Sequence, residues 1–103
     1  MKNILMIICD QLSATALKAY GNDYVKAPNI DSLSDNGVTF ENAYTSCPLC
    51  QPARASFWSS KYPHQTKVLS NLPDQGFDTF STEIETLGDL FSKNGYDCVH
   101  IGK

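Results

Sequence analysis

The strongest constraint on the fold is a continuous apolar run near the start of the chain. Residues 4–9 read Ile-Leu-Met-Ile-Ile-Cys, and the polar residues Asp10 and Gln11 follow at once. A strand covered on both faces carries such an unbroken run, whereas a half-exposed strand alternates apolar and polar side chains. The run is far shorter than the roughly 20 apolar residues that a membrane helix needs. It therefore predicts a buried strand of a mainly parallel sheet.

The elements that follow alternate between helices and short strands. Pro28 suits the first turn of a helix that Gly37 is well placed to end as its C′ residue, and Thr86 with Asp89 forms a capping box at the start of another. In chain order we predict a strand at 4–9, a helical turn at 12–19, a helix at 28–36, a strand at 38–40, a helix at 53–58, a long loop at 61–81, a helix at 87–94 and a strand at 96–101. This order predicts an α/β fold, a partial, mainly parallel sheet flanked by helices.

The composition narrows the class of partner. The net charge of −3 is weak and the 8 basic residues are scattered, so we expect no nucleic-acid partner. The apolar run at 4–9 is too short for a signal peptide and Asp10 interrupts it, so we expect a cytoplasmic protein without a membrane partner. An upstream leader would make the same chain secreted. Cys9 and Cys98 lie in apolar runs, where core packing is the expected role.

One pentapeptide carries the chemistry: Cys50-Gln51-Pro52-Ala53-Arg54. It resembles the sulfatase signature C-x-P-x-R, whose Cys is oxidised after translation to formylglycine. The resemblance extends over most of the chain, through Asp10-Gln11, the segment Pro28 to Leu33, the segment Gly37 to Tyr44, and Gly95-Tyr96 through Gly102-Lys103. The Asp-Gln pair is similar to the subgroup of choline sulfatase and phosphonate monoester hydrolases. The chain is thus identified as a member of the sulfatase family, which belongs to the alkaline phosphatase superfamily.

The resemblance implies a role for six residues. Cys50 would become the nucleophile, Arg54 would orient it, and Lys103 would contact the sulfate. Asp10 and Gln11 would bind a divalent metal together with modified Cys50, and His64 would touch the substrate. A sulfate ester is an anion, so these cationic groups and a metal suit it. The expected metal is calcium, and manganese fits the same oxygen ligands.

The resemblance also implies the partners. The substrate would be a small anionic sulfate ester, and a formylglycine-generating enzyme would act on Cys50. Residues 1–103 would form the N-terminal portion of one catalytic domain. We expect this portion to be inactive by itself and to self-associate through exposed sheet edges.

Two alternatives stay open. Phosphate or phosphonate esters suit the same nucleophile, metal and cations. Cys47-Pro48-Leu49-Cys50 is also a C-x-x-C, which would indicate a thiol–disulfide oxidoreductase. The oxidoreductase hypothesis leaves Arg54 and the Asp10-Gln11 pair unexplained. One departure from the sulfatase pattern concerns the residues after the signature helix, where Ser59-Ser60 replaces the usual Thr-Gly or Ser-Gly and removes an easy left-handed position.

Overall fold

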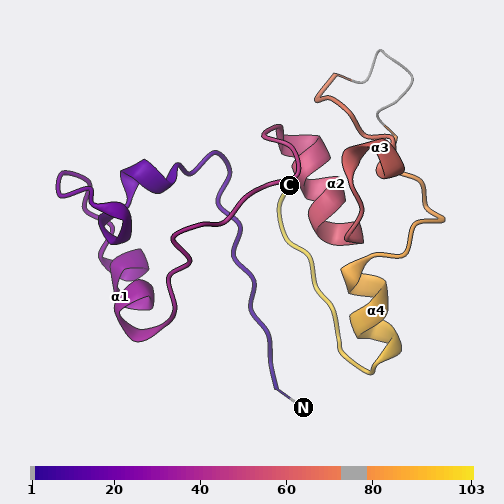
Figure 1. Cartoon of the computed structure of the whole chain (residues 1–103). Helices are drawn as coiled ribbons and strands as arrows, with labels where there is room; N and C mark the ends of the chain where they lie inside the picture. Colours follow the sequence, from indigo (N-terminus) through magenta and orange to yellow (C-terminus); the bar gives the residue numbers. More distant parts are fainter. Residues whose placement is uncertain (1, 73–78) are drawn as a thin grey trace. The chain divides into compact units, whose positions relative to one another are not determined.

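The computed structural model of the chain describes residues 2–72 and 79–103. It divides into two compact units, Met1–Tyr44 and Thr45–Lys103, which are described separately below. Within the described residues the regular structure is entirely helical (Figure 1). None of those helices is both long and apolar enough to cross a membrane.

The first unit contains two short 3-10 helices and one α-helix. These are η1 (Ala14–Ala16), η2 (Lys18–Tyr20) and α1 (Pro28–Asn36). The predicted helical turn is thus confirmed as two 3-10 turns, and Gly21 ends the second with a φ of 91°, as a glycine without a Cβ readily does. The Tyr20 hydroxyl donates to the Phe40 carbonyl at 2.8 Å, which holds the chain after α1 against η2.

The predicted glycine at the end of α1 is confirmed, but its physical reason differs. Pro28 is the first residue of α1, and Gly37 follows its last residue. Gly37 has φ −128° and ψ −147°, so it does not adopt the left-handed conformation that a C-terminal glycine usually provides. A Cβ on Gly37 would lie 2.8 Å from the Leu33 carbonyl oxygen. Close backbone approach, rather than a positive φ, therefore requires glycine here.

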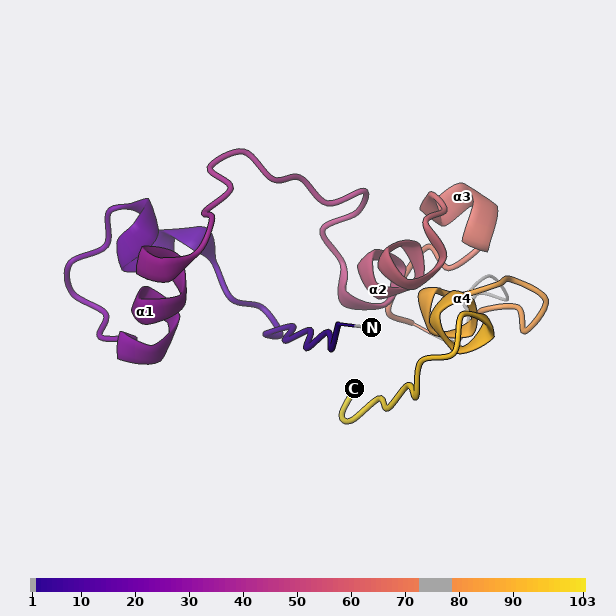
Figure 2. The ribbon, with the colours of Figure 1, turned by 90° about the horizontal axis from the view of Figure 1, so that it is seen from below.

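The second unit is built around α2 (Cys50–Ser59), which packs against α3 (Pro63–Thr66) and α4 (Leu87–Lys93) (Figure 2). The predicted helix at 53–58 is confirmed and extends three residues earlier, with Pro52 in its first turn. Among the residues that the structure describes, Ala55 and Val68 are the buried apolar ones, and the Pro52 and Thr66 side chains are also fully buried. The buried face of α2 therefore meets the segment that contains α3.

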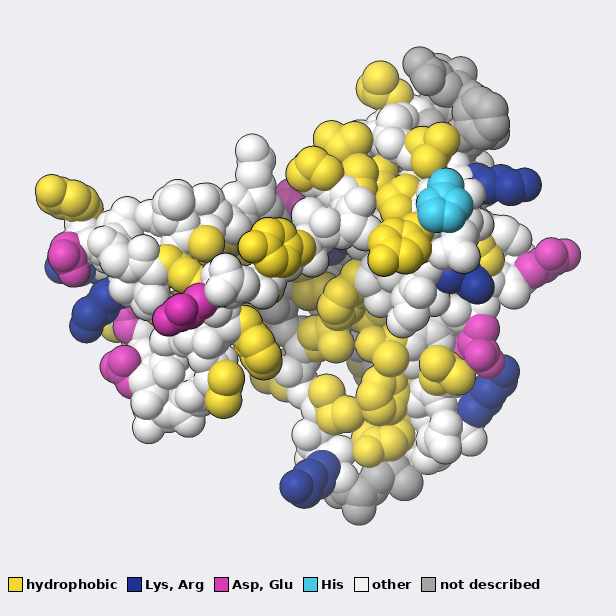
Figure 3. All heavy atoms as spheres, viewed as in Figure 1, with side chains coloured by type: hydrophobic (Ala, Val, Ile, Leu, Met, Phe, Trp, Pro, Cys, Tyr) yellow, Lys and Arg dark blue, Asp and Glu magenta, His cyan; other side chains and the backbone are white. Residues whose placement is uncertain are grey.

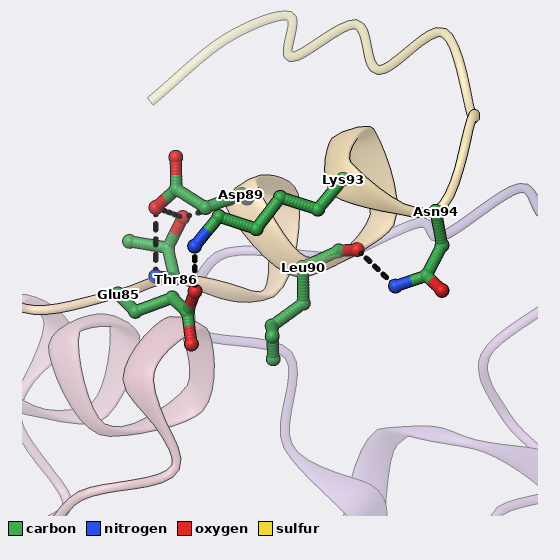
Figure 4. Close-up of polar contacts among 6 residues, drawn as sticks. All are labelled: Glu85, Thr86, Asp89, Leu90, Lys93 and Asn94. Atoms are coloured by element: carbon green, nitrogen blue, oxygen red, sulfur yellow. Dashed lines mark hydrogen bonds and ion pairs between the residues drawn. The ribbon is translucent and has the colours of Figure 1, made fainter.

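The ends of α4 follow the pattern that its sequence predicts. The Thr86 hydroxyl accepts from the Asp89 N–H at 3.2 Å, and the Asp89 carboxylate accepts from the Thr86 N–H at 2.8 Å and from its hydroxyl at 2.7 Å (Figure 4). At the other end the Tyr96 N–H donates to the Phe91 carbonyl, and Gly95 has a φ of 81°. These contacts satisfy free backbone groups at both ends of a helix of only 7 residues.

The predicted strands are not found in the part of the chain that the structure describes. Residues 4–9, 38–40 and 96–101 have no strand partner there. The prediction that residues 4–9 are buried is wrong for this chain: Leu5 is 85% exposed and Ile7 70% exposed. A strand is buried on two faces only when other strands pair with it and helices cover it. Within the described residues no strand pairs with residues 4–9, and the segment stays exposed. The mainly parallel sheet therefore stays a prediction.

Two further expectations need correction. Cys9 and Cys98 are exposed rather than packed in a core, because each belongs to one of these unpaired segments. The predicted long loop at 61–81 contains the short helix α3. The Gln65 side-chain oxygen accepts from the N–H of Tyr62, the residue before this helix, at 2.9 Å. Residues 73–78 of that loop lie outside the described residues. Apolar side chains are visible over the surface in Figure 3, consistent with this small core.

The capping box of α4 makes the helix sensitive to acid. Hydrogen bonds from the Thr86 hydroxyl and N–H, with a smaller attraction from Lys93, hold the pKa of Asp89 below its ordinary 3.8. A lowered pKa stabilises the folded state above that ordinary value, and the stabilisation is lost as pH falls through the lowered pKa. We expect Thr86→Ala to raise the pKa of Asp89 and Thr86→Ser to preserve it, measured by NMR titration of the side-chain carboxyl. A pKa that both variants leave in place would contradict the capping role.

The end of α2 offers a stabilising substitution. Ser60 has φ 55° and ψ 28°, a left-handed conformation that costs a residue with a Cβ about 1 kcal/mol or more. We expect Ser60→Gly to raise the free energy of unfolding by about 1 kcal/mol, measured by denaturant unfolding followed by circular dichroism. The matched control is Ser59→Gly, which places glycine inside the helix and removes the hydroxyl that donates to the Ala55 carbonyl at 2.6 Å. The control should lose stability; a loss with both variants would refute the left-handed strain.

Candidate active site

The first turn of α2 places Cys50, and its free backbone groups are satisfied from two directions. Leu49 precedes the helix in an extended conformation and its side chain makes no capping bond, but its carbonyl accepts from the Ala53 N–H at 2.9 Å. The Asn71 side-chain oxygen accepts from the Gln51 N–H at 2.9 Å, across 20 residues of chain. Pro52 has no N–H to satisfy. A distant asparagine therefore takes the place of the missing local cap.

Arg54 lies one turn after Cys50 on α2. Residues four apart share a helix face, so the spacing in the signature places the guanidinium beside the thiol-bearing end of the helix. Both side chains are partly exposed. The Arg54 Nη1 donates to the main-chain oxygen of Lys103 at 3.3 Å, across 49 residues of chain. The structure thus brings the Arg54 side chain to the main chain of Lys103. Arg54 itself belongs to the helix that begins with Cys50.

Asp10 and Gln11 lie in the first unit, at the end of the exposed apolar run. Gln11 has a φ of 57°, a left-handed conformation that is uncommon for a residue with a side chain. Their carboxylate and amide oxygens are hard donors of the type that Ca²⁺ or Mn²⁺ accepts. Within the described ranges, however, no three His, Cys, Asp or Glu side chains cluster around a possible metal position. The chemistry of this pair fits a metal, and two residues are too few to complete its shell of about six to eight oxygens.

His64 lies on α3 and is exposed. Its ring stacks on the Tyr62 ring, with centroids 5.9 Å apart and an angle of 10° between the planes. This contact orients the imidazole on the surface of the second unit. The structure gives it no bond to Cys50 or to substrate-binding groups among the described residues, so its substrate role stays a prediction.

Two residues of the site were not predicted from the sequence. Asn71 falls in a stretch without periodicity, and nothing in its local pattern points to a helix that begins 21 residues earlier. Thr45 binds Cys47 on both sides: its hydroxyl donates to the Cys47 carbonyl at 2.8 Å and accepts from the Cys47 N–H at 3.4 Å. Of these two residues, only Thr45 could have been found from the sequence, because a Thr just before a turn commonly forms such local bonds.

The Asn71 cap can be tested on the backbone that it holds. Replacing a capping asparagine by alanine typically costs about 1 kcal/mol. We therefore expect Asn71→Ala to speed hydrogen exchange at the Gln51 amide by roughly fivefold, the factor that 1 kcal/mol represents. Asn94→Ala is the matched control, since the Asn94 side chain donates to the Leu90 carbonyl at 2.8 Å on α4. Equal protection of Gln51 in the Asn71→Ala chain and the unaltered chain would show that the cap contributes nothing.

Comparison with known proteins places this arrangement in a family. A Delta 4,5-hexuronate-2-O-sulfatase from Bacteroides thetaiotaomicron is 45% identical over 101 residues, which cover 98% of this chain and 21% of that protein. A choline-sulfatase from Rhizobium meliloti is 36% identical over 101 residues, 98% of this chain and 19% of its own length. The solved structure of a 2-O GAG sulfatase is 44% identical with a TM-score of 0.84, covering 92% of this chain and 20% of that one.

The chain therefore spans about a fifth of the length of the curated relatives that it matches. The family model described as Sulfatase matches residues 2–103, which is nearly the whole sequence. The solved neighbours at 44% identity are themselves sulfatases. This chain belongs to the sulfatase family.

Proposed function

We propose that the chain supplies the nucleophile-bearing part of a sulfuric ester hydrolase, in which Cys50 is converted to formylglycine. The observation that carries this proposal is the C-x-P-x-R pattern at the start of α2, which puts Arg54 one turn after Cys50 in a chain that the sulfatase family model matches over residues 2–103. The Arg54 guanidinium also donates to the main-chain oxygen of Lys103 at 3.3 Å. A C-x-x-C oxidoreductase would have no use for that arrangement, and membership of the sulfatase family also favours hydrolysis.

The chain's own residues would bind and orient the anion. A sulfate ester carries negative charge on its sulfuryl oxygens, and the leaving oxygen gains charge during cleavage. The N-terminal end of α2 adds positive potential beside residue 50. The Arg54 guanidinium would orient the modified side chain, and the Lys103 ammonium would act as a point charge on the sulfate. Hydrated formylglycine, when formed, supplies the oxygen nucleophile.

A divalent cation is the second component of the proposal. Asp10 would contribute charge and Gln11 a neutral carbonyl oxygen, and modified Cys50 would be the third ligand in this chain. Calcium suits such oxygen ligands, and manganese would be accepted by the same set. The remaining ligands would come from the part of the domain that the relatives possess and this chain does not span. When bound, the metal would offset charge on the ester.

The whole enzyme would complete the predicted sheet. We infer that residues 1–103 form the N-terminal portion of one catalytic domain, with the apolar segments 4–9 and 96–101 as parallel strands. Their exposure in this chain supports the inference, because Leu5 and Ile101 are 85% and 90% exposed and gain from burial. The portion alone would be inactive and would associate through these edges.

The relatives suggest the class of substrate. The similarity to a hexuronate 2-O-sulfatase, at 45% identity, exceeds that to a choline-sulfatase, at 36%. We therefore favour a 2-O-sulfate ester of a sugar acid over choline sulfate, and a sulfate ester over a phosphate or phosphonate ester. The formylglycine-generating enzyme would be a protein partner of the same chain, in the cytoplasm if no leader precedes it.

Conversion of Cys50 can be measured directly. We expect peptide mass spectrometry of the chain, coexpressed with a formylglycine-generating enzyme, to find an aldehyde at residue 50. Arg54→Ala should lower that conversion because it removes the last residue of the signature, and Lys61→Ala, outside the signature, should leave it unchanged. In the full-length enzyme, Cys50→Ser should reduce sulfate-ester turnover by roughly 10³-fold or more, as the loss of a nucleophile does in other hydrolases. An active full-length enzyme that retains an unaltered thiol would refute the proposal.

A further inference from the structure

Cys47 and Cys50 lie in one tetrapeptide whose two ends are held by separate contacts. The Thr45 hydroxyl binds both the N–H and the carbonyl of Cys47. Cys50 is fixed as the first residue of α2, whose next N–H donates to Asn71. Between them the chain bends at Pro48 and Leu49. Only two residues separate the cysteines, so a bond between the two sulfurs would close a short loop at a small cost in entropy.

The two thiols are also the right pair among the four cysteines. Both are free and partly exposed, so a soluble oxidant reaches them. Cys98 is in the same unit, but its sulfur contacts the Gly88 and Tyr96 carbonyl oxygens at 3.6 and 3.8 Å. Cys9 belongs to the other unit. Cys47 alone lies within three residues of Cys50 in the sequence.

We propose that Cys47 and Cys50 form a reversible disulfide that withholds Cys50 from conversion to formylglycine. The oxidant is a low-molecular-weight disulfide such as oxidised glutathione. The thiolate of one cysteine attacks it, forms a mixed disulfide and releases one glutathione thiol. The thiolate of the other cysteine then attacks the protein sulfur of that mixed disulfide and releases the second. Two protein thiols become one disulfide, and one oxidised glutathione becomes two reduced molecules.

The consequence for function follows from the sulfur atom. Formation of formylglycine removes the sulfur of Cys50, so a chain cannot carry both the aldehyde and the disulfide. The disulfide would hold the precursor in an unconverted form, and reduction would release it. This inference rests on the proposed function of Cys50, while the disulfide itself does not, so the two can fail separately.

The experiment uses the chain in its reduced form and after equilibration with oxidised glutathione. Free thiols are alkylated, and the peptide that spans residues 45–54 is mapped by mass spectrometry. Each sample is also treated with a formylglycine-generating enzyme, and the aldehyde at residue 50 is quantified. We expect the Cys47–Cys50 link in the oxidised sample, a fall in conversion of about tenfold or more, and recovery after reduction with dithiothreitol.

Two variants make the result specific. Cys47→Ser should form no link and should convert equally well in both samples. Cys98→Ser, in the same unit but outside the tetrapeptide, should behave like the unaltered chain. Thiols that stay free, glutathione that remains on Cys50, or conversion that oxidation leaves unchanged would each overturn the inference. If the reduced chain is not converted at all, the proposed function fails, and the disulfide map of the same samples still decides whether the sulfurs pair.

Discussion

The second unit depends on how the start of α2 is held. A helix begins with N–H groups that have no partner inside the helix, and Leu49 has no polar side chain to offer them. Asn71 supplies an acceptor to Gln51 from 20 residues away. The same bond ties the segment after α3 to the helix that α3 packs against. One polar contact thus joins the start of the helix that carries Cys50 and Arg54 to the segment after α3.

Local signals predicted the helices well because the physical causes are local. Pro28 and Pro52 both occupy the first turn of a helix, where a missing N–H has no cost. Thr86 and Asp89 cap α4 as their spacing predicts. The sequence also indicated that residue 60, where a glycine is usual, is a left-handed position. Ser60 does adopt the left-handed conformation, which a glycine would adopt without strain.

The features that sequence reasoning missed depend on distant parts of the chain. Asn71 has no periodic neighbours to mark it, and its partner Gln51 is recognisable only in three dimensions. Gly37 was predicted at the right place for the wrong reason, because the close approach of the Leu33 carbonyl is a property of the folded backbone. The strand at 4–9 is the extreme case. An apolar run specifies that a segment prefers burial, but its burial requires neighbours that the described residues do not provide.

The residues that we propose for the active site belong to both units, so the unpaired segments matter for the proposed chemistry. Cys50 and Arg54 belong to the second unit, whereas Asp10 and Gln11, the proposed metal ligands, belong to the first. A metal and a nucleophile act together only when something fixes their separation to within fractions of an ångström. The carboxyl ends of parallel strands meet at one edge of a sheet. Asp10 directly follows the segment 4–9, and Lys103 follows the segment 96–101, so pairing of these two segments in one sheet would set both residues at that edge. In the proposed enzyme, the register of these two apolar runs would determine how Asp10 and the helix that starts at Cys50 are placed around the substrate.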